Sequence, residues 1–180
     1  MHQVLARIGD ISLSKVDVIV NAANGAFSGG GGVDTSIHRA AGPELLAECR
    51  TLSAGRPGEV KLTGAYRLPS RFVAHAVGPV WSGGEKGEPE QLASCYRTAI
   101  ELAANNGARS IAFPSISTGA YKYPVKIAAK IAIETVYSSL RSVREPIAVD
   151  FVLFSQSDYR VYQRILDQRD ADRDIDISKP

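Results

Sequence analysis

Two stretches of the sequence combine glycines with small polar residues in a pattern that suits an anionic ligand. The first, NAANGAFSGGGGVDTSIHRAAGP over residues 21–43, places four consecutive glycines directly before Val33, Asp34 and a predicted helix. Ordering four adjacent glycines has a large entropic cost, so the run is either a flexible linker or a loop where a ligand needs the backbone to come close. Glycines let main-chain N–H groups approach a diphosphate, and the positive end of the following helix lies nearby.

The second stretch, FPSISTGAYKYP over residues 113–124, again follows a predicted strand and precedes a predicted helix. Its central residues offer successive amides and small hydroxyls. Neither stretch is a nucleotide P-loop, because GGGGVDTS lacks the GK[ST] ending, and the GxGxxG spacing is absent as well. Two such loops at two strand ends could hold a diphosphate from both sides.

Short β-branched runs alternate with longer amphipathic segments along the chain. The predicted strands are residues 3–8, 16–22, 71–77, 110–115 and 148–154. The predicted helices are residues 34–42, 43–52, 89–107, 124–140 and 158–168. Strands alternating with helices predict an α/β fold with the sheet between helical layers. Right-handed crossovers then gather the loops after the strands at one edge, where such sheets bind ligands.

Length and composition favour one ordinary globular domain. We assign residues 1–168 to this domain and expect the charged segment 169–180 to fray, in a chain of 180 residues. A formal net charge of +2 gives no case for a broad basic nucleic-acid surface.

With no apolar run near the roughly 20 residues of a membrane span, and no signal-peptide pattern, we expect a cytoplasmic protein. No exposed apolar stripe is evident, so we expect a monomer. Cys49 and Cys95 are 46 positions apart without a CxxC, which indicates plain buried thiols and no metal site.

The two loops, together with GDIS (9–12) and HAVGP (75–79), closely resemble the macrodomain family. The nearest resemblance is to its bacterial branch of MacroD-type ADP-ribosyl hydrolases and O-acetyl-ADP-ribose deacetylases. It covers residues 3–168, and its most specific part is VIVNAANGAFSGGGGVDTSIHRAAGP, which matches a pattern NAAN…GGGGVD…IHRAAGP. The resemblance implies a three-layer α/β/α sandwich around a mixed, mostly parallel sheet. It also implies an ADP-ribose cleft along the upper edge of that sheet and no cofactor.

The resemblance assigns roles along the ADP-ribose molecule. Asp10 is expected to accept a hydrogen bond from the adenine amino group, the Ile11 amide to contact the adjacent ring nitrogen, and Phe154 to pack against the ring. Asn24 is expected to contact the distal ribose. The remaining substrate-binding residues are Asn21, Gly32, Val33, Asp34, Ser117, Thr118, Gly119, Ala120 and Tyr121.

The residue types also indicate a chemistry. Hydrolysis of an ester on the distal ribose needs a positioned, polarised water, and a carboxylate acting as general base contributes about 10²–10⁴-fold. The resemblance gives this role to Asp34, with Asn24 fixing the ribose. His38 follows Asp34 at i+4 on the same helical face and could support the site.

Each of these residues also has a purely structural interpretation. Asp34 could be the N-cap of its helix, a role compatible with catalysis. Asn24 and Asp10 could each stabilise a turn. His38 and His75 are of a type that more often packs than catalyses, and for His75 we favour packing.

The second loop departs from the family pattern at one position. GAYKYP places Lys122 where family members commonly have glycine, which could restrict the loop or add positive charge beside the phosphates. The neighbouring Tyr121 is either a lid over the ligand, which we favour, or a loop anchor.

The sequence leaves three functions in competition. The first is a hydrolase that removes mono-ADP-ribose from acidic side chains of proteins and deacetylates O-acetyl-ADP-ribose. The second is a binding module that recognises ADP-ribose without turnover, and the third is a phosphatase acting on ADP-ribose 1″-phosphate. Binding modules of this fold commonly lack the asparagine–aspartate combination, so Asn24 together with Asp34 favours the hydrolase.

Overall fold

The computed structural model describes residues 2–177, and side chains as far as residue 172. Six strands form one sheet in the order β1-β6-β5-β2-β4-β3, in which all neighbours are parallel except β3 and β4. The strands are β1 (Gln3–Ile8), β2 (Val18–Ala23), β3 (Val60–Gly64), β4 (Phe72–Val77), β5 (Ser110–Phe113) and β6 (Ala148–Leu153). The predicted mixed, mostly parallel sheet is therefore confirmed.

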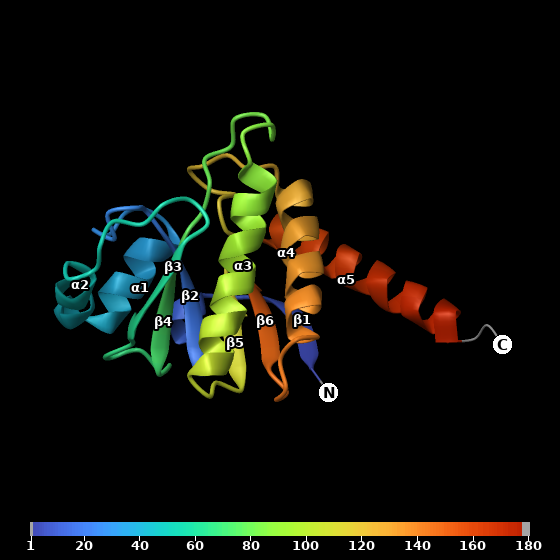
Figure 1. Ribbon diagram of the computed structural model, residues 1–180, viewed down its shortest axis with the longest axis horizontal. Coiled ribbons are helices and arrows are strands. Elements are labelled where there is room, and N and C mark those ends of the chain that lie inside the picture. The colour runs from blue at the N-terminus through green and yellow to red at the C-terminus, as the bar shows by residue number, and fades with distance from the viewer. Residues whose placement is uncertain (1, 178–180) are drawn as a thin grey trace.

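Helices cover both faces of this sheet. They are α1 (Val33–Ala41), α2 (Pro43–Cys49), α3 (Glu88–Asn105), α4 (Val125–Leu140) and α5 (Gln156–Ile177), with a short 3-10 turn η1 (Ile11–Leu13) after β1. In Figure 1, α3 and α4 lie side by side in front of the strands. The C-terminal part of α5, in red, extends beyond the sheet on the right. Two separate clusters of buried side chains, one with α3, α4 and α5 and one with α1 and α2, confirm the three-layer α/β/α sandwich.

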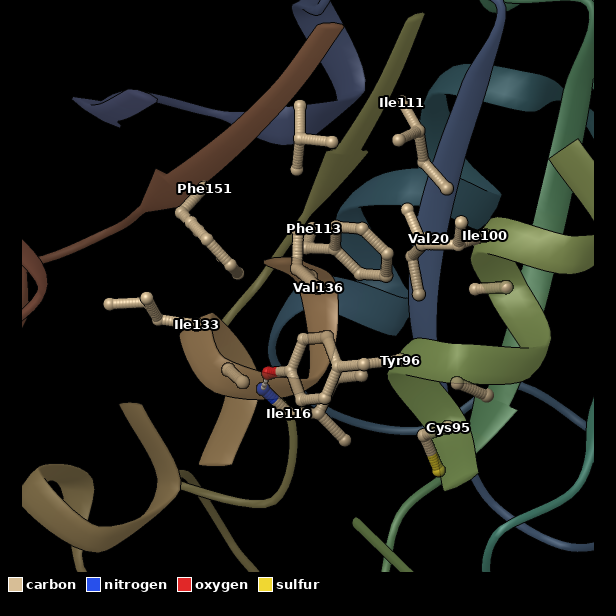
Figure 2. Packing of buried hydrophobic residues seen from close by; sticks show 14 of the residues in the cluster. Val20, Cys95, Tyr96, Ile100, Ile111, Phe113, Ile116, Ile133, Val136 and Phe151 are labelled. Atoms are coloured by element: carbon tan, nitrogen blue, oxygen red, sulfur yellow. Dashed lines mark hydrogen bonds between the residues drawn. The ribbon is translucent and has the colours of Figure 1, made fainter. Parts of the chain in front are cut away.

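Side chains of β2 alternate between these two clusters. Val18 and Val20 face α3 and α4, while Ile19 faces α1 and α2. Burial on both faces explains why the parallel strands are nearly continuous apolar runs. On the α3–α4 side, the rings of Phe113, Phe151 and Tyr96 lie near one another in tilted and edge-on contacts, as Figure 2 shows.

Two elements differ from the sequence prediction. Strand β3 was not expected, because VKLTG is a short, half-exposed edge strand that pairs antiparallel with β4. The last helix does not end at residue 168 but continues to Ile177, so residues 169–177 are helical. A cation–π contact helps to explain the extension, because the Arg169 guanidinium lies 4.1 Å from the centre of the Tyr137 ring on α4. Residues 178–180 of the expected tail lie outside the described part of the chain.

Within residues 2–177, no helix combines the length and the apolar character that crossing a membrane requires. The cytoplasmic location and the monomeric state stay predictions.

Candidate functional site

A cleft of about 590 Å³ lies along the edge where the parallel strands end. The segments that follow β1, β2, β4, β5 and β6 all contribute to its walls. The predicted site residues that line it are Asp10, Ile11, Asn24, Gly32, Val33, Asp34, Ser117, Thr118, Gly119, Ala120, Tyr121 and Phe154. Asn21 and His38 do not belong to this lining. The sheet thus brings both glycine-containing loops to one cavity.

The glycine run turns the chain from β2 into α1. Gly32 is the N-cap residue, with φ 63° and ψ −130°, a conformation that only glycine adopts readily. The expectation that Asp34 caps the helix was therefore wrong: Asp34 is the second residue of α1. No hydrogen bond among residues 2–177 uses the N–H groups of Gly30, Gly31 or Gly32. Since the first N–H groups of a helix also lack intrahelical acceptors, this wall of the cleft presents several free donors.

Asn24 organises the start of the glycine loop. Its Oδ1 accepts hydrogen bonds from the N–H groups of Ala26 (3.1 Å) and Ser28 (3.4 Å), and its Nδ2 donates to the Gly29 carbonyl at 3.1 Å. The turn-stabilising interpretation is therefore correct, and Asn24 also lines the cleft. Its contact with a distal ribose stays a prediction.

The Asp34 carboxylate is buried and hydrogen-bonded at the wall of the cleft. The residue is only 3% exposed. Its Oδ1 accepts a 2.6 Å hydrogen bond from Asn21 Nδ2 and lies 3.2 Å from His38 Nε2. Its Oδ2 would lie 3.2 Å from a Cβ atom built on Gly30, so a side chain there would require a small shift of the carboxylate or the loop. One oxygen is thus fixed by donors from behind, and the other faces the glycine loop.

His38 and Asn21 contact the Asp34 carboxylate and do not line the cleft. His38 contacts the carboxylate from i+4, as the helical spacing predicted, and its buried Nδ1 has no hydrogen-bond partner among the described residues. Asn21 is fully buried, because residues 19 and 21 of β2 both face α1 and α2. Its expected contact with substrate is therefore not possible in this structure.

His75 is a buried packing histidine, as expected. Its Nδ1 lies 3.1 Å from Asn21 Nδ2 and its Nε2 lies 2.9 Å from Thr63 Oγ1. Burial, with a smaller contribution from the charge of His38, lowers the pKa of His75 from 6.5 to about 4.

This lowered pKa predicts a stability change with pH. The unfolded chain binds a proton at His75 below pH 6.5, whereas the folded chain resists it until about pH 4. The contribution of neutral His75 is therefore fully present above pH 6.5 and lost as the pH falls towards 4, by up to about 3 kcal/mol. Thermal melts should show that His75→Asn, although less stable at pH 7, loses less stability than wild type over this range. Parallel losses in the two proteins would contradict the assignment.

The second loop, residues 114–121, is held by internal hydrogen bonds that leave several of its backbone N–H groups free. Thr118 Oγ1 donates to the Ser115 carbonyl at 2.9 Å, and the Tyr123 N–H donates to the Ser117 carbonyl at 3.0 Å. Ser117 itself has a φ of 67°. The N–H groups of this loop without an acceptor among residues 2–177 are those of Ser115, Ser117, Gly119, Ala120 and Tyr121. Successive free amides of this kind form a binding site for an anion.

Aromatic residues beneath the second loop hold it in place. The Ile116 N–H donates to the Tyr96 hydroxyl at 3.2 Å, a contact visible in Figure 2. The Trp81 N–H donates to the Tyr121 carbonyl at 2.9 Å. Tyr121 therefore anchors the loop through its backbone, while its side chain stays a predicted lid over the cleft.

Lys122 takes a backbone conformation that favours glycine, the residue that the family resemblance led us to expect here. Its φ is 59°, in the left-handed region, and its N–H donates to the Gly119 carbonyl at 3.0 Å. A non-glycine residue in this region costs about 1 kcal/mol.

Lys122→Gly is therefore expected to raise the free energy of unfolding by about 1 kcal/mol, measured by urea denaturation. Lys122→Ala is the matched control, because it removes the charge and keeps the Cβ atom. If Lys122→Ala stabilised the protein equally, charge and not backbone strain would be the cause.

The other end of the cleft carries the expected adenine residues. Asp10 Oδ1 accepts hydrogen bonds from the N–H (2.9 Å) and hydroxyl (2.7 Å) of Ser12, so Asp10 caps η1. Its second carboxylate oxygen is free of these bonds. Ile11 is the first residue of η1, where an N–H lacks an intrahelical acceptor. Phe154 is 86% exposed at the rim, which is unusual for a large apolar ring.

One group of side chains in the described part of the chain has metal-ligand spacing. Ligand atoms of His38, Cys49 and His75 lie within 4.8 Å of one another. Burial raises the pKa of the Cys49 thiol to about 11, and Thr63 already occupies His75 Nε2. Cys49 and His75 thus pack between α2 and the sheet, and His38 contacts Asp34 from its own helix, α1.

Sequence reasoning missed part of the lining. Gly78, Ser36, Pro114 to Ile116, Val152, Leu153 and Asp158 also line the cleft. Gly78 was visible within HAVGP, but its role depends on the approach of the second loop and has no local signal.

Comparisons with known proteins agree with this geometry. Residues 20–132 match the family described as Macro domain. A Macro domain-containing protein of Chlorobaculum tepidum is 57% identical over 87% of this chain and 91% of its own. A protein of Cronobacter sakazakii named O-acetyl-ADP-ribose deacetylase is 51% identical over 90% and 92%. The structure of the Oceanobacillus iheyensis macrodomain with ADP is 45% identical, with a TM-score of 0.89 over 93% of this chain and 92% of that one. The chain therefore belongs to the Macro domain family.

Proposed function

We propose that this chain binds ADP-ribose in the cleft and hydrolyses esters on its distal ribose, with Asp34 activating the water. The observation that carries the proposal is the position of Asp34, a buried carboxylate on the wall of a cleft with free N–H groups on two loops. Those N–H groups suit the diphosphate of the ligand. The carboxylate suits hydrolysis of the ester, because it can activate the attacking water.

The relatives support the same assignment. One relative at 51% identity is named O-acetyl-ADP-ribose deacetylase, and the solved macrodomain at 45% identity holds ADP, which is part of ADP-ribose. By analogy, the adenine would lie between Asp10 and Phe154, and the distal ribose beside Asn24.

The same site would serve two substrates, because O-acetyl-ADP-ribose and mono-ADP-ribose on an acidic side chain both carry an ester at the distal ribose. In deacetylation, the water oxygen attacks the acetyl carbonyl carbon while Asp34 takes a proton from the water. The bond between that carbon and the ribose oxygen then breaks, and the ribose oxygen takes up a proton. The products are acetate and ADP-ribose.

Two measurements test the proposal on the purified chain. Calorimetry should show uptake of ADP-ribose, and chromatography should show ADP-ribose released from O-acetyl-ADP-ribose and from a mono-ADP-ribosylated acceptor protein. Binding with both substrates left intact would favour a non-catalytic reader. Release of phosphate from ADP-ribose 1″-phosphate, with both esters intact, would favour a phosphatase. No uptake of ADP-ribose by folded protein would overturn the assignment.

A further inference from the structure

Behind Asp34, buried side chains form a continuous hydrogen-bonded chain that reaches the edge strand β3. Asn21 Nδ2 donates to Asp34 Oδ1 at 2.6 Å and lies 3.1 Å from His75 Nδ1. His75 Nε2 lies 2.9 Å from Thr63 Oγ1, and that hydroxyl is 3.0 Å from the Gly64 carbonyl. The four side chains are at most 3% exposed. Strand register creates this contact, since Asn21 of β2 and His75 of β4 are direct partners.

The protons in this chain have one consistent arrangement. The Thr63 hydroxyl donates its hydrogen to the Gly64 carbonyl, so it accepts from His75 Nε2–H. His75 Nδ1 is then an acceptor, and it takes a hydrogen from the Asn21 amide. The low pKa of His75, about 4, keeps the imidazole neutral.

This arrangement determines which way the Asn21 amide points. Its NH₂ group has two acceptors, the carboxylate of Asp34 and the imidazole of His75. A flipped amide would place Oδ1 against both acceptors, which is repulsive. In the observed orientation Oδ1 is buried without a partner. Leaving a buried acceptor unpaired is unfavourable, so the two donations outweigh that loss.

We propose that Asn21 and His75 are positioning residues for the reaction: the imidazole orients the amide, and the amide holds the Asp34 carboxylate aimed at the water. Thr63 selects the tautomer of the imidazole. The inference rests on the proposed function for its kinetic part, but the hydrogen-bond chain can be tested without turnover.

Asn21→Leu removes the donor and keeps a side chain of similar size. We expect kcat for O-acetyl-ADP-ribose to fall about 10- to 100-fold, the worth of a hydrogen bond to a charged group, with little change in KM. In wild type, the ring ¹⁵N shifts of His75 should show a proton at Nε2 and an acceptor at Nδ1.

Two His75 variants separate positioning from packing. His75→Leu removes the acceptor at Nδ1, whereas the Oδ1 of an asparagine can occupy the Nδ1 position. We expect His75→Asn to recover most of the kcat that His75→Leu loses, even though leucine suits a buried site better and should be the more stable. A purely structural role predicts the opposite order, in which activity follows the melting temperature. Ser94→Ala, which removes a remote hydrogen bond to the Gly58 carbonyl, is the control for general loss of stability.

A proton at Nδ1 of His75 in wild type overturns the inference, whether or not the chain turns over substrate. Wild type without turnover defeats the proposed function alone, because the ring nitrogens of His75 still report on the hydrogen-bond chain. Turnover that Asp34→Asn abolishes and Asn21→Leu preserves would overturn the inference and leave the function standing.

Discussion

Asp34→Asn is expected to lower kcat for O-acetyl-ADP-ribose by about 10²–10⁴-fold while calorimetry shows nearly unchanged affinity for ADP-ribose. The amide has the shape of the carboxylate, and its oxygen can still accept from Asn21 and His38. It cannot take a proton from water at neutral pH. The loss should therefore fall on the chemical step and spare the glycine-loop geometry.

Asp167→Asn is the matched control. Asp167 is exposed on α5 and accepts a hydrogen bond from Gln163, which an asparagine oxygen can also accept. The same chemical change at this site should leave kcat as in wild type. If Asp34→Asn retained wild-type kcat, a different group would have to activate the water, and the proposed mechanism would be wrong.

Gly78→Ala is expected to disrupt the second loop and weaken ADP-ribose binding at least tenfold. A Cβ atom at Gly78 would overlap Ser117 Oγ and lie 2.7 Å from Ile116 Cγ2. Such overpacking costs about 1–3 kcal/mol, and 1.4 kcal/mol is a factor of about ten in affinity. Residues 116 and 117 must shift to make room, and the loop they belong to carries free N–H groups at the wall of the cleft.

Two further variants test whether the effect of Gly78→Ala comes from its clash with the second loop. Gly64→Ala lies in β3, where a new Cβ would find no atom closer than 3.6 Å, so binding should be unchanged. In the double variant Gly78→Ala/Ser117→Gly, the nearest clash is gone and the left-handed φ of residue 117 suits glycine. Partial recovery of affinity is expected. Equal affinity of Gly78→Ala and wild type would show that the loop tolerates the displacement.

Local chemistry explains why much of the fold could be predicted from the sequence. Strand runs such as residues 16–22 and 148–154 are apolar because helices cover both faces, and this pattern needs no knowledge of partners. The edge strand β3 lacks that signal, since it is half-exposed and pairs on one side only. The continuation of α5 beyond residue 168 was missed for a related reason. Its sequence is charged, and the contact between Arg169 and Tyr137 joins elements distant in the chain.

The sequence by itself determined the two anion-binding loops, because glycine runs and helix starts are local features whose backbone consequences do not depend on the rest of the chain. It also placed Asp34 and His38 on one helical face, since a helix has a fixed period. Only the tertiary structure decided that Asn21 faces away from the cleft, that His75 lies behind it, and that Gly78 has no room for a side chain. Those three facts depend on strand register and on the approach of a loop nearly 40 residues away. Contacts of that kind join segments that are far apart in the chain. Neither segment alone contains a sequence pattern that predicts its contact with the other.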